Sequence, residues 1–181
     1  MANRFLAWFV TALLAAVSGV AQSQTPSSTA TTAGNATTAL QGQDATFLAK
    51  AAEADRIEIA QAQAAIDNAQ RSQTKSTARM LLDDHRRSSD QLQQLASRKG
   101  WTWPSTSASV ESDQARMMST SGPGFDDRFM ADQIRAHRDA IALYRAQASS
   151  GSDPDLRRFA RDQLPALEHH LEMLQGANSQ K

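Results

Sequence analysis

The sequence contains no cysteine among its 181 residues. Disulfide bonds, thiolate metal ligands and cysteine nucleophiles are therefore excluded, and packing alone must stabilise the folded chain. Glycine and proline are sparse, with 8 and 5 occurrences, and no glycine-rich phosphate-binding loop is present. Aromatic residues make up only 6% of the chain. Because Ala, Gln, Leu, Arg and Asp dominate after residue 45, the composition favours helices over strands.

The chain has no excess of charge of either sign, since 19 basic residues balance 19 acidic ones. Nucleic-acid-binding domains usually carry a clustered basic surface, so we expect no nucleic acid as a partner. A chain of 181 residues is typical of one domain and is long enough to bury a substantial core.

Long apolar runs are absent except near the N-terminus, where residues 5–17 are almost wholly apolar and follow Arg4. Gly19 and Ala21 then occupy positions typical of a cleavage site. This pattern predicts a secretory signal peptide over residues 1–21, and an uncleaved anchor helix is the alternative. The run is short for a membrane span, and no later stretch is apolar enough to cross a bilayer. We therefore expect an exported chain, periplasmic or associated with the outer membrane, whose mature form has no transmembrane span.

Residues 22–43 are rich in Ser, Thr, Ala, Gly and Gln and contain almost no large apolar side chain. Such a segment cannot bury enough surface to offset the entropy lost on ordering. We predict a disordered tether over residues 22–43, a folded domain over residues 44–176 and a short tail over residues 177–181.

The folded region contains four stretches in which apolar residues recur at spacings of three and four, the pattern of an amphipathic helix. These stretches cover residues 44–73, 76–98, 125–148 and 154–174. Gly100 follows the second stretch as an expected C-terminal cap, Gly176 lies beyond the fourth, and Asp153 precedes Pro154 at a helix start. Pro165 should kink the last helix. The sequence thus predicts an all-α four-helix bundle, with a short extra helix near residues 110–119 in the connection between the second and third helices.

Each predicted helix carries one ionisable or metal-binding residue on its apolar stripe. These residues are Glu58, His85, His137 and His170. Helices of a bundle contribute ligands from facing sides, and imidazole with carboxylate suits zinc, iron, manganese or copper. The pattern therefore predicts a divalent transition metal in the core, with Asp84 beside it to fix the tautomer of one imidazole; Asp55 is a further candidate for such a contact. A purely structural network of buried hydrogen bonds would give the same pattern.

Di-iron bundles place two ligands on one helical face with Glu-x-x-His motifs, and no glutamate of this chain has a histidine three residues later. A ferroxidase centre is therefore not expected. His169 lies beside the leucine stripe of the last helix rather than on it, so we place it on the surface.

Four segments resemble the exported bacterial family known as domain of unknown function 4142. They are "FLAKAAEADRIEIAQAQ", "MLLDDHRRSSDQLQQLA", "FDDRFMADQIRAHRDAIALYRAQA" and "DPDLRRFARDQLPALEHHLEML". The Leu-Pro-x-Leu-x-x-His pattern of the last segment identifies His170 as the histidine typical of the family. The resemblance covers about residues 44–175 and implies a ferritin-like helical bundle in the cell envelope, without an established activity.

Together these observations predict an exported helical-bundle protein of the bacterial cell envelope that binds a transition metal through core histidines and glutamate. The alternative is a non-enzymatic envelope or stress-related protein that acts through a protein or envelope partner and whose inner histidines are structural. No motif indicates a substrate, so an enzyme is the least favoured reading.

Overall fold

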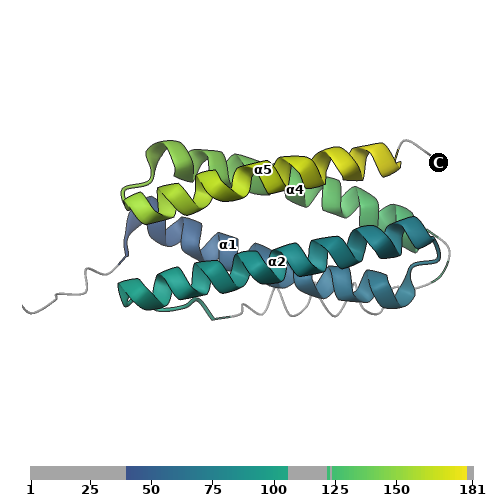
Figure 1. Ribbon diagram of the computed structural model, residues 1–181, viewed down its shortest axis with the longest axis horizontal. Helices are drawn as coiled ribbons and strands as arrows, with labels where there is room; N and C mark the ends of the chain where they lie inside the picture. The colour runs from purple at the N-terminus through teal and green to yellow at the C-terminus, as the bar shows by residue number, and fades with distance from the viewer. Residues whose placement is uncertain (1–39, 106–121, 123, 179–181) are drawn as a thin grey trace, which may run out of the picture. The chain divides into compact units, whose positions relative to one another are not determined.

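The computed structural model describes residues 40–105, 122 and 124–178, all within the compact unit Ala36–Lys181. In this part of the chain every regular element is a helix (Figure 1). The bounds are Gly42–Asn68 for α1, Ser72–Lys99 for α2, Phe125–Ser150 for α4 and Pro154–Asn178 for α5. The predicted all-α four-helix bundle is confirmed. The predicted signal peptide, most of the tether, the short helix near residues 110–119 and the end of the tail lie outside the described residues.

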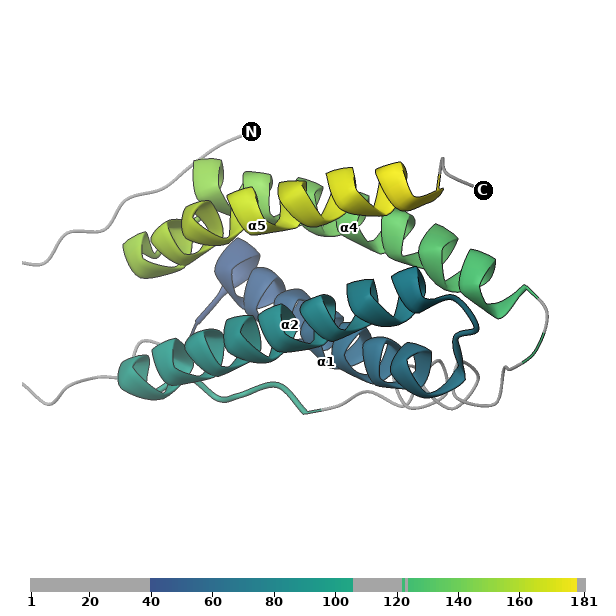
Figure 2. The ribbon, with the colours of Figure 1, turned by 45° about the vertical axis from the view of Figure 1, so that its right-hand side comes forward.

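The bundle consists of two antiparallel helical hairpins, α1–α2 and α4–α5, which lie one over the other (Figures 1 and 2). Between the hairpins, α1 packs against α4 and α2 against α5, and these contacts are sparser than those within each hairpin. Gln43 at the start of α1 donates a hydrogen bond to the Ala146 carbonyl near the end of α4, and Lys99 at the end of α2 pairs with Asp153 and Asp155 at the start of α5. Neighbouring helices are therefore antiparallel, and residues 100–124 connect opposite ends of the bundle.

The core has two hydrophobic clusters, one toward each end of the bundle. The first gathers Phe47, Leu92, Tyr144 and Leu156, among others. The second is built around Leu81, Phe125, Phe129 and Leu174. The predicted site residues lie in the middle of their helices, so a polar layer separates the two clusters. This layer is the part of the core that hydrophobic burial alone does not explain.

The two hairpins repeat one another in the positions that they bury. Four pairs of identical buried residues, whose members are always the same number of residues apart, are Asp44 and Asp126, Phe47 and Phe129, Ala78 and Ala160, and Leu92 and Leu174. In α1 and α4 the repeated aspartate lies in the first turn, three residues before the repeated phenylalanine. The two hairpins therefore share part of their buried pattern.

The repeated aspartates dock each hairpin onto the turn of the other. Asp126 accepts hydrogen bonds from the backbone N–H groups of Gln70 and Arg71, both at 2.9 Å. Asp44 accepts from the N–H groups of Ser152 and Asp153 at the opposite end of the bundle. Each carboxylate thus satisfies two backbone donors of a turn that would otherwise lack partners.

This docking explains where the helix bounds differ from those predicted. We expected α1 to reach about residue 73 and α2 to begin near Ser76, but α1 ends at Asn68 and α2 begins at Ser72. Ala69 is extended, and the two residues after it donate to Asp126. Because this region contains neither glycine nor proline, the turn is set by a tertiary contact.

Of the other predicted helix ends, the end of α2 and the start of α5 are confirmed, and the end of α5 is not. Gly100 caps α2 with a positive φ of 68°, as expected, and the Asp153 side chain caps α5 by accepting from the N–H groups of Asp155 and Leu156. The prediction that Gly176 lies beyond the last helix was wrong, since α5 continues to Asn178, and α5 also passes through Pro165 without a break. Pro165 is exposed, so water can satisfy the carbonyl that its ring leaves free. Within the described residues, no helix combines the length and apolarity needed to cross a bilayer.

The docking role of Asp126 is testable against its neighbour Asp127, an exposed acidic residue in the same helical turn. Asp126→Ala leaves two backbone N–H groups without their acceptor and should lower the free energy of unfolding by about 2–4 kcal/mol. Asp127→Ala removes an exposed ion pair with Arg71 and should cost less than about 1 kcal/mol. Urea unfolding at neutral pH measures both, and equal losses would contradict the docking role.

The same contact predicts a dependence on pH. Burial alone would raise the pKa of Asp126, but the N–H donors of Gln70 and Arg71 lower it below its ordinary value. The stabilisation by Asp126 is therefore present above the unfolded-state pKa of about 3.9 and is lost as pH falls through the lower folded-state value. The stability difference between wild type and Asp126→Ala should accordingly shrink below about pH 4.

Candidate metal centre

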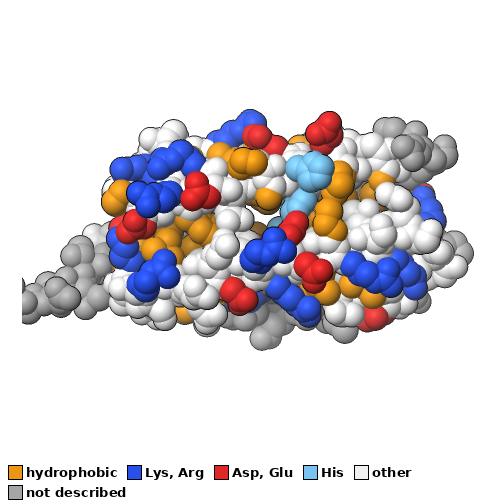
Figure 3. Space-filling model, viewed as in Figure 1, with side chains coloured by type: hydrophobic (Ala, Val, Ile, Leu, Met, Phe, Trp, Pro, Cys, Tyr) orange, Lys and Arg blue, Asp and Glu red, His pale blue; other side chains and the backbone are white. Residues whose placement is uncertain are grey.

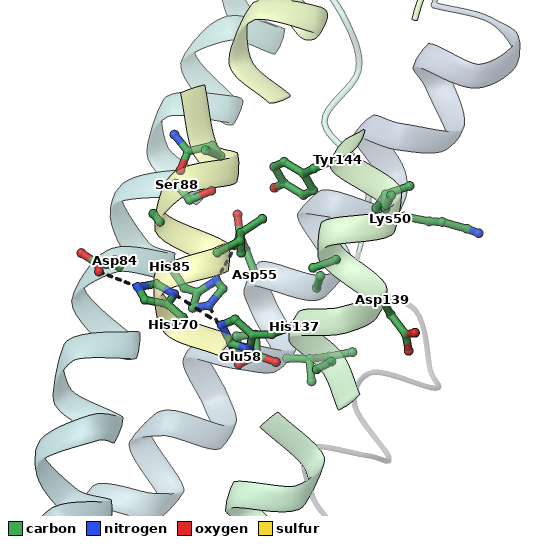
Figure 4. Close-up of a pocket in the computed structure, with 18 residues that line it drawn as sticks. Lys50, Asp55, Glu58, Asp84, His85, Ser88, His137, Asp139, Tyr144 and His170 are labelled. Atoms are coloured by element: carbon green, nitrogen blue, oxygen red, sulfur yellow. Dashed lines mark hydrogen bonds and ion pairs between the residues drawn. The ribbon is translucent and has the colours of Figure 1, made fainter. Parts of the chain in front are cut away.

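Three imidazole rings meet in the polar layer, each from a different helix (Figure 4). His85 on α2, His137 on α4 and His170 on α5 are all buried, with 6%, 1% and 3% of their surfaces exposed. Their ring centroids are 5.4 to 5.9 Å apart. One nitrogen of each ring lies within 4.8 Å of the corresponding nitrogens of the other two. The stripes in the sequence therefore predicted correctly which histidines come together.

The His137 and His170 rings are each oriented by a hydrogen bond through the nitrogen that faces away from the centre. His137 Nδ1 donates to the backbone carbonyl of Gln133 at 3.0 Å. His170 Nε2 donates to Asp84 Oδ2 at 2.9 Å. Because carbonyl and carboxylate oxygens only accept, these two nitrogens carry the ring protons. In the neutral rings the inward nitrogens, His137 Nε2 and His170 Nδ1, therefore present lone pairs.

The two inward nitrogens are 3.3 Å apart. Burial and the charge of His85 lower the pKa of His137 to about 3, and burial is also the main cause that lowers the pKa of His170. At neutral pH no proton is therefore expected between the two lone pairs. A metal ion bound tetrahedrally at about 2.0–2.1 Å from each nitrogen would hold them roughly 3.3 Å apart. The pair thus has the separation that a shared ion requires.

His85 connects the three rings to the buried carboxylates of α1. Its Nδ1 lies 2.9 Å from Asp55 Oδ1, and its Nε2 lies 4.0 Å from Glu58 Oε2. Among the described residues, neither His85 Nε2 nor Glu58 Oε2 has a hydrogen-bond partner. Burial alone would lower the pKa of His85, but the hydrogen bond to Asp55 and the charge of Glu58 raise it. Burial raises the pKa of Glu58 to about 6, although His85 opposes this shift.

Gln133 is a residue of this polar layer that the sequence analysis did not identify. It is fully buried, and its side-chain amide donates to Gln61 Oε1 at 2.9 Å. The Gln133 side chain also hydrogen-bonds to the Glu58 carboxylate, while its carbonyl orients His137. The sequence could have indicated Gln133 through its position four residues before His137, because this spacing places both residues on one helical face.

All five predicted site residues lie at this polar layer, but among the described residues only the three histidines place one potential ligand atom each within 4.8 Å of one another. His85, His137, His170 and Glu58 point potential ligand atoms inward. Asp84, on α2, is partly exposed and accepts a hydrogen bond from the outward nitrogen of His170. This contact fixes the tautomer of one imidazole, the role that the sequence predicted for Asp84. Asp55 does the same for His85. His169 is exposed, as expected.

The fold and the sequence each have known relatives. A crystal structure of a DUF305 fragment from Deinococcus radiodurans is similar to 79% of this chain and 99% of that fragment, with a TM-score of 0.68 and 15% sequence identity. At this identity the likeness shows the helical fold alone. No curated protein matches the sequence. The family model described as a domain of unknown function, DUF4142, matches residues 29–176, which include all five candidate residues. The chain therefore belongs to the DUF4142 family, as the four segments of its sequence predicted.

Proposed function

We propose that this protein binds one divalent transition-metal ion in the middle of its bundle, through His85, His137 and His170 with Glu58 as the carboxylate ligand. The observation that carries the proposal is the pair of lone pairs on His137 Nε2 and His170 Nδ1, which face each other at 3.3 Å in a buried site. Without a cation between them, two such groups repel one another, and in a buried layer this repulsion is only weakly screened. A metal ion between the two nitrogens would accept both lone pairs and form a bond to each nitrogen.

The charges of the layer support a divalent ion. Asp55 and Glu58 are 3% and 4% exposed, and a buried carboxylate needs a compensating charge. In the metal-bound state the three imidazoles are neutral and supply none, so a dication balances the two carboxylates. The inward atoms are nitrogen and oxygen without sulfur, a donor set that suits zinc, iron, manganese or copper in the divalent state.

The support around the ligands also fits a metal centre. Each histidine donates the N–H of its outward ring nitrogen to a carboxylate or a carbonyl, an arrangement that fixes the tautomer and raises the basicity of a metal-ligating imidazole. When bound, an ion held in this way would supply a positive charge and, at an open position, Lewis acidity. The chain's own residues orient the rings and exclude bulk water from them.

The adjacent histidines of α5 give a matched test of metal binding. The protein purified without a histidine tag should contain about one equivalent of metal by ICP-MS, or take one up when a single ion is added. His170→Ala removes an inward nitrogen and should weaken binding at least about 100-fold. His169→Ala removes an exposed imidazole from the next position and should change the affinity less than about twofold.

A second candidate follows from the raised pKa of His85. As an imidazolium, His85 could pair with both Asp55 and Glu58, so that the layer is stable as a hydrogen-bonded structural network. In that case zinc, iron, manganese and copper would all fail to bind above about a tenth of an equivalent. His85→Ala would then lower the free energy of unfolding to the same extent in the presence and absence of metal.

Metal affinity should fall as the pH falls, because protons compete for the ligands. The pKa of His85 is raised above its ordinary value of 6.5, so the metal must displace about one proton near neutral pH. Below about pH 6 Glu58 also gains a proton, and the number displaced should rise to about two. Titrations of the dissociation constant from about pH 8 to pH 5 measure this slope. A constant affinity over that range would contradict the ligand set, and His169→Ala should follow the wild-type curve.

We also propose that the chain is exported to the bacterial cell envelope, on the basis of the apolar segment over residues 5–17 and the small residues that follow it. Cleavage after Ala21 should give a mature chain that begins at Gln22. Cell fractionation with N-terminal sequencing tests this. Replacing Leu13 and Leu14 by arginine should abolish export, because the apolar segment is interrupted, and an uncleaved chain in the cytosol would overturn the proposal.

A further inference from the structure

A cavity of about 320 Å³ lies beside the three histidines. All four helices line it, and small or aliphatic side chains form much of its wall. These include Ala54, Ile57, Ala136, Ala140, Leu143 and Leu167. On the face formed by α2 and α5, the surface is hollowed next to the histidine side chains (Figure 3). Small molecules can therefore reach an apolar space next to the polar layer.

Besides His85 Nε2 and Glu58 Oε2, a third buried polar atom at this cavity has no hydrogen-bond partner among the described residues. Asp55 uses Oδ1 to hold His85, but Asp55 Oδ2 has no hydrogen-bond partner among the described residues. Only 3% of Asp55 is exposed, so an unpaired acceptor at this position is costly. In Figure 4 the Asp55 carboxylate lies between the histidines and the side chains of Ser88 and Tyr144.

The other polar groups nearby do not satisfy this oxygen. The hydroxyl groups of Ser88 and Tyr144 hydrogen-bond to each other. The missing partner of Asp55 Oδ2 is therefore a donor that comes from outside the chain. A charged oxygen makes a strong bond to an O–H group, and the aliphatic wall favours an apolar body behind that group.

We propose that this cavity binds a small, neutral, apolar molecule with one hydroxyl group, of the size and chemistry of a monophenol. Its O–H group donates to Asp55 Oδ2, and its ring packs against the aliphatic wall. A cavity of about 150 Å³ holds benzene, so this one has room for a ring with a short substituent. An anion is disfavoured because Asp55 and Glu58 already place carboxylates at the cavity.

This site does not depend on the proposed metal. Asp55 Oδ2 is not one of the grouped nitrogen atoms that could hold an ion, so the proposed hydrogen bond does not require one. Binding to chelator-treated protein and to metal-loaded protein can thus be measured separately. If the probe binds in neither state, the cavity proposal is wrong. If the protein takes up no metal, the function proposed above is wrong, and the cavity proposal is unaffected.

Calorimetric titration of the chelator-treated full chain with phenol and with toluene tests the proposal. The two probes have nearly the same shape, but only phenol carries a donor. Phenol should bind at least about tenfold more tightly than toluene, because one charge-assisted hydrogen bond distinguishes them. Equal affinities would overturn the role of Asp55, and no binding of either probe would overturn the cavity as a ligand site.

Two variants of the wall complete the test. Ala54→Leu fills the cavity and should weaken phenol binding at least about tenfold, whereas Ala49→Leu makes the same change at an exposed position of α1 and should leave it unchanged. Leu143→Ala enlarges the cavity, so 4-propylphenol should gain at least about threefold relative to phenol. An Ala54→Leu protein that folds and binds phenol with wild-type affinity would overturn the location of the site. An unchanged ratio of the affinities for 4-propylphenol and phenol in Leu143→Ala would do the same.

Discussion

Asp44 and Asp126 each hold the turn of the opposite hairpin through two backbone N–H groups, and these contacts align the two hairpins that carry the candidate metal centre. His85 and Glu58 belong to one hairpin, while His137 and His170 belong to the other. Helix contacts between the hairpins are sparser than those within them. The carboxylate–turn contacts at the two ends therefore fix how the halves of the ligand set face each other in the middle.

The polar layer between the hydrophobic clusters reduces the stability that a wholly apolar core would give. Buried ion pairs and hydrogen bonds roughly offset the desolvation of their own groups, so the layer is not explained by stability. The outward atoms of all three rings have hydrogen-bond partners, whereas His85 Nε2 and Glu58 Oε2 have none among the described residues, and this supports the proposed metal site. This difference between the two sides of the rings is the observation that favours the proposed metal site over a purely structural network.

The sequence predicted the helices, their buried faces and the convergence of the histidines, because a helix repeats its face every three to four residues. It could not place the α1–α2 turn, since no local breaker lies there and Asp126 is distant in sequence. Gln133 was missed because a glutamine resembles a surface residue until its partners are known. The cavity was missed because it depends on how closely the hairpins approach, which no single helix determines.

In the repeat of the two hairpins, Asp55 is equivalent to His137, and Ser88 is equivalent to His170. If two identical copies of the α1–α2 hairpin formed the bundle, Asp55, Glu58 and His85 would each occur twice in one core. Four carboxylates would then face two imidazoles, an excess of buried negative charge that one divalent ion could not balance. Joining the hairpins in a single chain allows one half to supply the carboxylates and the other to supply two of the three imidazoles.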